Sequence, residues 1–188
     1  ELPKVCEHIT LPVQAGDDEV LSRMRRTYTR SEYVEMVGRI RDTVPGVSVS
    51  TDIIVGFPGE TEEQFQRTLD LLTDLRLDKV HCAPYSTRPG TTAHRNMEDD
   101  VPKQEKSGRR ERVDRLQERI LAEINAGLVG TTKEVLVEGR QKGKWQGRSR
   151  SNKLVFFEDD GYHLSELVDV RIDRASPWSL QGTMVGSK

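Results

Sequence analysis

The chain has 188 residues, 32 % of them charged and 34 % hydrophobic, and its 29 basic and 31 acidic side chains give a formal net charge of −2. This length suffices for one large or two small domains with a buried core. No apolar run approaches the ~18 residues of a membrane span, and no signal-peptide core is present. These features exclude an integral membrane protein and predict a soluble, cytoplasmic one.

Charge is unevenly distributed along the chain. The first 100 residues carry 12 basic and 18 acidic side chains, whereas residues 139–153 contain six basic residues and no acidic one. A local cationic run on an acidic protein predicts a polyanionic partner at one end. The chain begins with Glu1 instead of Met, and its first predicted strand follows no helix or turn, so we expect a piece of a longer protein.

The first hundred residues alternate predicted strands and helices. Residues 4–14 alternate apolar and polar side chains as a strand does. The acidic pair Asp17-Asp18 then caps a short helix, and a capping box of Thr29 with Glu32 opens the next one.

A β-branched run over residues 47–55 predicts a buried parallel strand. The turn that follows contains Gly56 and Pro58, whose small or pre-bent backbone lets a bound molecule approach closely. Thr61 caps a helix over 62–75. Strand, turn and capped helix place a site at the carboxyl end of a strand, where α/β folds bind ligands. The alternative is a plain β-to-α turn.

Residues 78–85 predict a third strand, followed by a Pro/Gly loop over 86–92. The alternation predicts parallel strands joined by right-handed crossovers. Three strands are too few to close a (β/α) barrel. Residues 1–100 are therefore interpreted as a partial α/β barrel.

The rest of the chain predicts a connector and a second domain. A long polar helix with one narrow apolar stripe is expected over residues 101–127, as a connector. Short strands broken by glycine then predict a small antiparallel β-barrel over residues 128–188. These strands are expected at 134–138, 145–150, 154–157, 167–172 and 179–183.

Polar residues stand where the predicted parallel strands end, namely Gln14, Asp52 and the pair Tyr85-Ser86. Such strand ends share one edge of a sheet, so these residues can converge. A carboxylate among Ile and Val is costly to bury unless it is bonded, and a ribose diol suits Asp52 as a donor. The alternative is an aspartate bonded to a backbone amide. Arg26, in a run of basic residues, is expected at the surface on sequence alone.

The basic run at 139–153 predicts a hairpin that binds nucleic acid. Its cations attract phosphates, and an exposed Trp145 would offer a surface for base stacking. The alternative is a solvated basic turn with Trp145 in the barrel core. The candidate contacts are Lys142, Lys144, Trp145, Arg148, Arg150, Asn152 and Lys153.

The histidines and cysteines predict no metal site. Cys6 and Cys82 lie far apart without CxxC or CxxxCxxC spacing, so we interpret both as reduced, buried thiols. His8 and His81 fall on predicted strands with no second ligand at a useful spacing. No residue is expected to act as a catalytic acid, base or nucleophile.

Three sequence blocks in order carry a resemblance that covers nearly the whole chain. LPVQAGDDEVLSRM, STDIIVGFPGET and APYSTRPGTTA, within residues 7–93, resemble the second half of the radical S-adenosylmethionine (radical SAM) barrel of the tRNA methylthiotransferase family. GRSRSNKLVFF and WSLQG resemble the TRAM domain of those proteins. The first two blocks look more like the enzymes that act on isopentenylated adenosine. The sibling enzymes that modify a ribosomal-protein aspartate show an LQH-type block instead.

The resemblance implies roles for individual residues. Gln14 and Asp52 match residues that contact the ribose of S-adenosylmethionine, and Arg26 matches one that holds its methionine carboxylate. The adenine and methionine sides would be lined by the Gly56-Phe57-Pro58-Gly59 turn, with Gly56 and Pro58 as its candidate contacts, and by Tyr85 and Ser86. The TRAM resemblance implies binding of the tRNA anticodon arm.

The chain departs from the family pattern because it lacks the CxxxCxxC loop and the three further cysteines that hold the family's two 4Fe–4S clusters. We therefore expect no radical chemistry from this chain alone, and assign activity to a longer parent whose N-terminal portion is its partner. The sibling enzyme and a non-catalytic RNA-binding protein remain as alternatives.

Overall fold

The computed structural model describes residues 4–187 and contains two compact units. Residues 10–45 and 49–117 form the first, called the α/β unit here. The chain up to Ile9, residues 46–48 and the chain from Glu118 onward form the second, called the barrel unit. The division falls inside the long helix that the sequence predicts as a connector.

Three strands form the first sheet, in the order β1 (His8–Thr10), β2 (Ser48–Val55) and β3 (Lys79–Pro84). β2 and β3 pair in parallel, as the sequence predicts, from Ser50 opposite Lys79 to Val55 opposite Pro84. β1 is shorter than the strand expected over 4–14, which was wrong in its extent. Pro12 has no N–H to donate, and the Val13 N–H is bound by the Thr51 side chain at 2.9 Å instead of by a strand.

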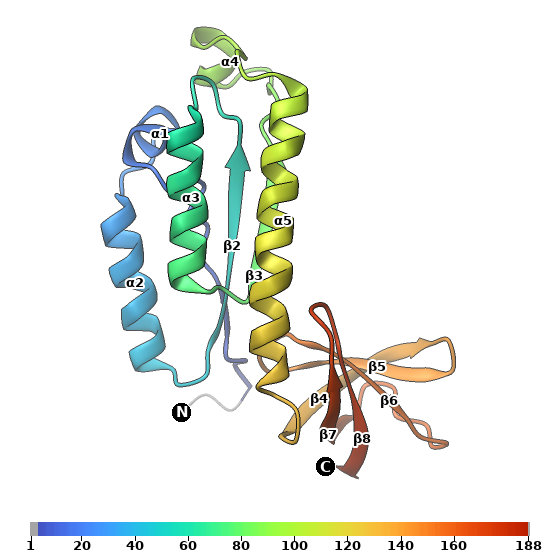
Figure 1. The fold of residues 1–188 in the computed structure, drawn as a ribbon. Helices are drawn as coiled ribbons and strands as arrows, with labels where there is room; N and C mark the ends of the chain where they lie inside the picture. Colours follow the sequence, from blue (N-terminus) through green and yellow to red (C-terminus); the bar gives the residue numbers. More distant parts are fainter. Residues whose placement is uncertain (1–3, 188) are drawn as a thin grey trace. The chain divides into compact units, whose positions relative to one another are not determined.

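Helices α1 (Asp18–Arg23), α2 (Arg30–Thr43) and α3 (Glu62–Leu75) begin at the predicted caps. Both capping boxes, Thr29 with Glu32 and Thr61 with Gln64, are formed and confirm the sequence pattern. Figure 1 shows α2 and α3 running alongside β2. α3 buries one continuous apolar face, made by Phe65, Leu69, Leu72 and Leu75. A one-turn helix, α4 (Thr92–Asn96), follows the predicted loop.

The long helix α5 (Lys103–Ala126) confirms the predicted helix, but its buried face is not the narrow apolar stripe alone. Polar residues lie on the same face as Val113 and Ile120, and each is at most 4 % exposed. They are Lys106, Arg109, Gln117 and Asn125. Each reaches a partner: the Gln117 amide, for example, donates to the carbonyl of Leu77 at 3.0 Å. These hydrogen bonds offset the free-energy cost of burying polar side chains.

Five strands close a small barrel in the order β4-β5-β6-β8-β7 (Figure 1). They are β4 (Thr132–Gln141), β5 (Lys144–Ser149), β6 (Leu154–Glu158), β7 (Leu167–Ala175) and β8 (Leu180–Ser187). The barrel is mixed, not antiparallel as expected, because β6 and β8 pair in parallel. A ring of five strands that alternate in direction must contain one parallel pair. Its core is built from nine buried residues that include Val135, Trp145, Phe157 and Ile172.

Candidate functional site

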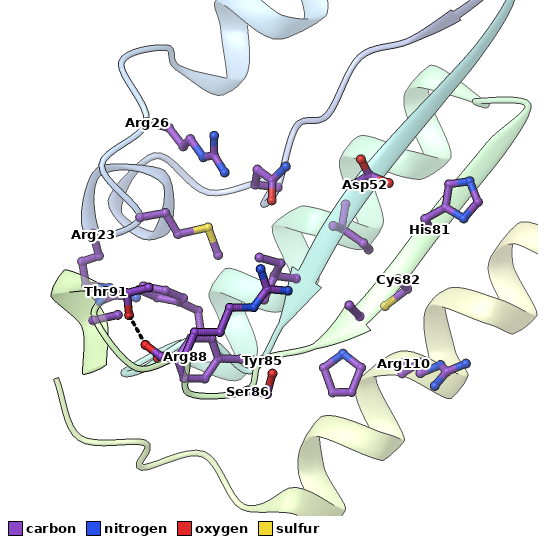
Figure 2. A pocket seen from close by; sticks show the side chains of 18 of the residues that line it. Arg23, Arg26, Asp52, His81, Cys82, Tyr85, Ser86, Arg88, Thr91 and Arg110 are labelled. Atoms are coloured by element: carbon purple, nitrogen blue, oxygen red, sulfur yellow. Dashed lines mark hydrogen bonds between the residues drawn. The ribbon is translucent and has the colours of Figure 1, made fainter. Parts of the chain in front are cut away.

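A cavity of about 800 Å³ opens in the α/β unit at the strand ends (Figure 2). Gln14, Arg26 and Asp52, which lie on three separate segments, all line it. Tyr85 and Ser86, directly after β3, line it as well. Its volume falls in the range of roughly 300–1,000 Å³ that is typical of small-molecule sites. Five of the seven residues predicted for the cofactor are thus brought together.

Gln14 is fixed against β2 by its backbone. Its N–H donates to the carbonyl of Asp52, and its carbonyl accepts from the N–H of Ile54, both at 2.9 Å. Its φ of 71° lies in the left-handed region, which is uncommon for a residue with a side chain. This pairing holds Gln14 beside β2, the middle strand of the sheet. Asp52 lies inside β2 and not at its end, which corrects its expected position.

Asp52 is half-buried on β2 between fully buried neighbours. Within residues 4–187 its carboxylate has no hydrogen bond or ion pair, so it is not the amide-bonded aspartate of the alternative interpretation. Both carboxylate oxygens are therefore available to accept bonds from a ligand in the cavity. A pair of ribose hydroxyls supplies such donors.

Arg26 is held at the cavity by the way α1 ends. Arg25 adopts the left-handed conformation, with φ of 59°, and the Arg26 N–H donates to the carbonyl of Leu21 at 2.9 Å. This closing turn is a Schellman-type helix end. Arg26 is exposed, as the sequence predicts, but it also lines the cavity. An arginine there can hold a carboxylate through two parallel bonds.

The turn after β2 reaches the cavity through Phe57, and Gly56 and Pro58 are buried behind it. Their expected place in the lining is corrected. A side chain on Gly56 would collide with the stem of Lys106 on α5, so this glycine serves packing against the helix. The Phe57 ring meets the Tyr85 ring edge to face, with centroids 5.1 Å apart. Within the turn that the resemblance implicated, Phe57 is the residue that lines the cavity.

Three of the six basic residues in the basic hairpin, residues 139–153, form ion pairs with acids of the barrel unit. Lys144 pairs with Glu158 at 3.0 Å, and Arg148 with Glu138 at 3.7 Å. Arg150 donates to both carboxylate oxygens of Glu7, at 2.8 and 2.9 Å. These bonds lower the pKa of Glu7. Lys142 and Asn152 are exposed in the two turns that flank β5, and Lys153 is half-buried.

Trp145 is 4 % exposed and belongs to the barrel core. The prediction that its ring is exposed for base stacking is therefore wrong, and the alternative of a core tryptophan holds. Its position on β5 points inward, opposite Phe157 on β6. The indole N–H donates to the carbonyl of Asp159 at 3.2 Å. An aromatic ring that the sequence reasoning missed is exposed instead: Tyr162, 73 % exposed, lies edge-on to Trp145.

His163, which the sequence reasoning also missed, lies between two carboxylates and is called the His163 clamp here. Its two ring nitrogens lie 2.6 Å from Asp159 and 2.9 Å from Glu166, so both nitrogens act as donors to carboxylates in the charged form. The bond to Asp159, with the one to Glu166, raises the pKa of His163, and the pKa of Asp159 is lowered.

The His163 clamp is expected to make the stability of the barrel unit depend on pH. A raised folded-state pKa gives stability that is complete below the unfolded value of about 6.5 and is lost as pH rises through the folded value. The thermal midpoint should therefore fall by a few degrees between about pH 5.5 and pH 8.5. His163→Gln should abolish this fall, whereas His94→Gln, exposed on α4, should retain it. Equal pH profiles for His163→Gln and the unchanged chain would contradict the clamp.

Neither cysteine contributes to a metal site in the part of the chain that the structure describes. No group of three or more His, Cys, Asp or Glu side chains there is arranged to hold a metal ion. Burial raises the pKa of the half-buried Cys82 to about 12. Cys6 is exposed, which corrects its expected burial. Among the described helices, none has the length and apolarity needed to cross a membrane.

Two separate segments of the chain are similar to known protein families. Residues 1–72 match the radical SAM superfamily, and residues 127–185 match the TRAM domain. Each match spans less than half of the chain, so the chain contains one segment similar to the radical SAM superfamily and one similar to the TRAM domain.

Individual proteins similar to this chain share one name. The chain is 50 % identical over 184 residues to a tRNA-2-methylthio-N(6)-dimethylallyladenosine synthase of Dehalococcoides mccartyi. It is 51 % and 52 % identical to proteins of that name from Herpetosiphon aurantiacus and Roseiflexus sp.. These alignments cover 98–100 % of this chain but only 40–44 % of each relative.

Proposed function

We propose that this chain is the C-terminal portion of a tRNA methylthiotransferase that acts on dimethylallyl-adenosine beside the anticodon. The α/β unit would bind the nucleoside and methionine parts of S-adenosylmethionine, and the barrel unit would bind the anticodon arm. The alignments cover less than half of each relative, so we assign the reaction to a longer protein that includes this chain.

One observation carries the proposal: Gln14, Arg26 and Asp52 line a single cavity although they come from separate segments. Their chemistry fits the cofactor. The unpaired carboxylate of Asp52 can accept bonds from the ribose hydroxyls, the Gln14 amide can donate to ribose oxygens, and the Arg26 guanidinium can hold the methionine carboxylate. Phe57 and Tyr85 offer aromatic surface to the adenine.

S-adenosylmethionine and an iron–sulfur cluster supply radical chemistry in this family, and this chain's own residues would bind and orient the cofactor. Cys6 and Cys82 stand too far apart in sequence for the close thiolate spacing that clusters use. Cluster ligands would therefore come from the rest of the parent protein.

Calorimetric titration of this chain with S-adenosylmethionine tests the cofactor site. Asp52→Ala should weaken binding about tenfold, or ~1.4 kcal/mol, because the ribose hydroxyls lose charge-assisted acceptors. Asp42→Ala removes an exposed carboxylate from α2, outside the cavity, and should leave the affinity unchanged. Equal affinities for the two variants, or no binding at millimolar cofactor, would contradict the assignment.

A further inference from the structure

The cavity carries more positive charge than the proposed cofactor needs. Five arginines and two aspartates line it. Two of these arginines already have hydrogen-bond or ion-pair partners within the protein. Arg23 donates to the Gly59 carbonyl and the Gln64 side chain, and Arg110 pairs with Asp114 at 3.6 Å. Within the described residues, the guanidinium groups of the other three have no hydrogen bond or ion pair. They are Arg25, Arg26 and Arg88.

S-adenosylmethionine has one anionic group, its carboxylate, and two cationic ones, the sulfonium and the ammonium. The carboxylate accounts for Arg26. Two further cations beside a cationic cofactor repel it unless another anion is present. A guanidinium binds carboxylates and phosphates through two parallel bonds, and the RNA substrate of the proposed function supplies phosphates, so we take the further anion to be a phosphate.

Arg25 and Arg88 approach the cavity from different segments. Arg25 occupies the left-handed turn that ends α1, where its N–H donates to the Ser22 carbonyl at 2.9 Å. Arg88 lies in the loop after β3, and Figure 2 shows its side chain extending from this loop toward the strands. The Thr91 hydroxyl donates to the Arg88 carbonyl at 2.9 Å, which closes the loop into a turn.

We propose that Arg25 and Arg88 bind a backbone phosphate of the RNA nucleotide whose base enters the cavity. This rests on the proposed function and adds to it a substrate contact within the α/β unit, separate from the barrel unit. Such a contact carries no sequence information; it sets how far the base enters toward the cofactor.

The test measures binding of an anticodon stem-loop RNA by fluorescence anisotropy over a series of KCl concentrations. Arg88→Gln and Arg25→Gln should each weaken binding about three- to tenfold near ~0.1 M salt and lower the log–log salt slope by roughly 0.7–0.9. Arg88→Lys keeps the charge and should keep the slope. Arg39→Gln, exposed on α2 and outside the cavity, is the matched control and should change neither quantity.

Two further measurements distinguish an RNA phosphate contact from a cofactor contact and from a free-nucleotide site. S-adenosylmethionine affinity should not fall in Arg88→Gln, because the substitution removes a cation from beside a cationic cofactor. A loss of affinity would assign Arg88 to the cofactor and overturn the inference. If adenosine monophosphate displaces the RNA when both are present at the same concentration, the arginines form a free-nucleotide site. This result would also overturn the inference. Unchanged salt slopes, together with a weakened Asp52→Ala cofactor site, would reject the phosphate contact and leave the proposed function standing.

Discussion

Replacing Arg109 by Met is expected to destabilise the α/β unit by about 3–5 kcal/mol, the cost of leaving one partner of a buried ion pair alone. The side chains of Arg109 and Glu60 are 2 % and 1 % exposed, and their atoms lie 2.7 Å apart. Arg109 also donates to the Glu60 carbonyl at 3.1 Å and to Glu105. In the variant, Glu60 would remain buried without a cation.

Burial raises the pKa of Glu60, opposed by the Gly56 N–H and by Arg109. Without Arg109 this pKa rises further, so the destabilisation should be smaller in acid, where Glu60 is protonated, than at neutral pH. Glu60→Gln in the Arg109→Met background should recover much of the loss for the same reason.

Urea unfolding followed by far-ultraviolet circular dichroism measures this effect, since helices α1 to α4 lie in the α/β unit. Arg115→Met is the control on the same helix: Arg115 is 65 % exposed and pairs with an exposed Glu111, so its loss should stay within about 0.5 kcal/mol. Equal losses for the two variants would show that the buried pair contributes nothing special.

The Arg109 variant should also weaken the cofactor site. Glu60 accepts from the Gly56 N–H at 2.5 Å, and this bond shapes the turn that carries Phe57 into the cavity. The buried pair of Arg109 on α5 with Glu60, which precedes α3, thereby supports Phe57 in the cavity lining.

Replacing Gly182 by Ala is expected to destabilise the barrel unit by about 3 kcal/mol, at the upper end of the range for overpacking. Gly182 lies on β8 between Phe157 of β6 and Ile172 of β7. An added Cβ would overlap the backbone carbonyl of Arg171 and stand 2.8 Å from Val170. Backbone cannot move aside unless β7 separates from β8.

Thermal unfolding followed by the fluorescence of the buried Trp145 should show a midpoint lower on the order of 15 °C for Gly182→Ala. Gly186→Ala is the control on the same strand, because its Cβ would meet nothing within 4 Å. A similar midpoint for both variants would mean that the strands tolerate the added methyl group.

Local rules predicted much of the fold. Capping boxes join residues three apart, so the starts of α2 and α3 could be read directly from the chain. The grouping of Gln14 and Tyr85 was also predictable, because parallel strands end at a common edge, but Asp52 lines the same cavity from inside β2 and not from its end.

Charges were predicted poorly, because their partners are remote in sequence. Arg109 is a solvated helix residue by composition, but it pairs with Glu60, 49 positions away. Arg150 stands in a run without acids, but it binds Glu7, 143 positions away. Counting charge along the chain therefore overstated the cationic character of the basic hairpin.

The sequence by itself determined the order of strands and helices and the turn after β2, because each depends on neighbours a few residues apart. Only the tertiary structure decided which cations are neutralised, which polar residues α5 buries, and that Trp145 points inward. Electrostatic pairing and burial depend on distances through space. Residues as remote in sequence as Glu7 and Arg150 come together only when the chain folds.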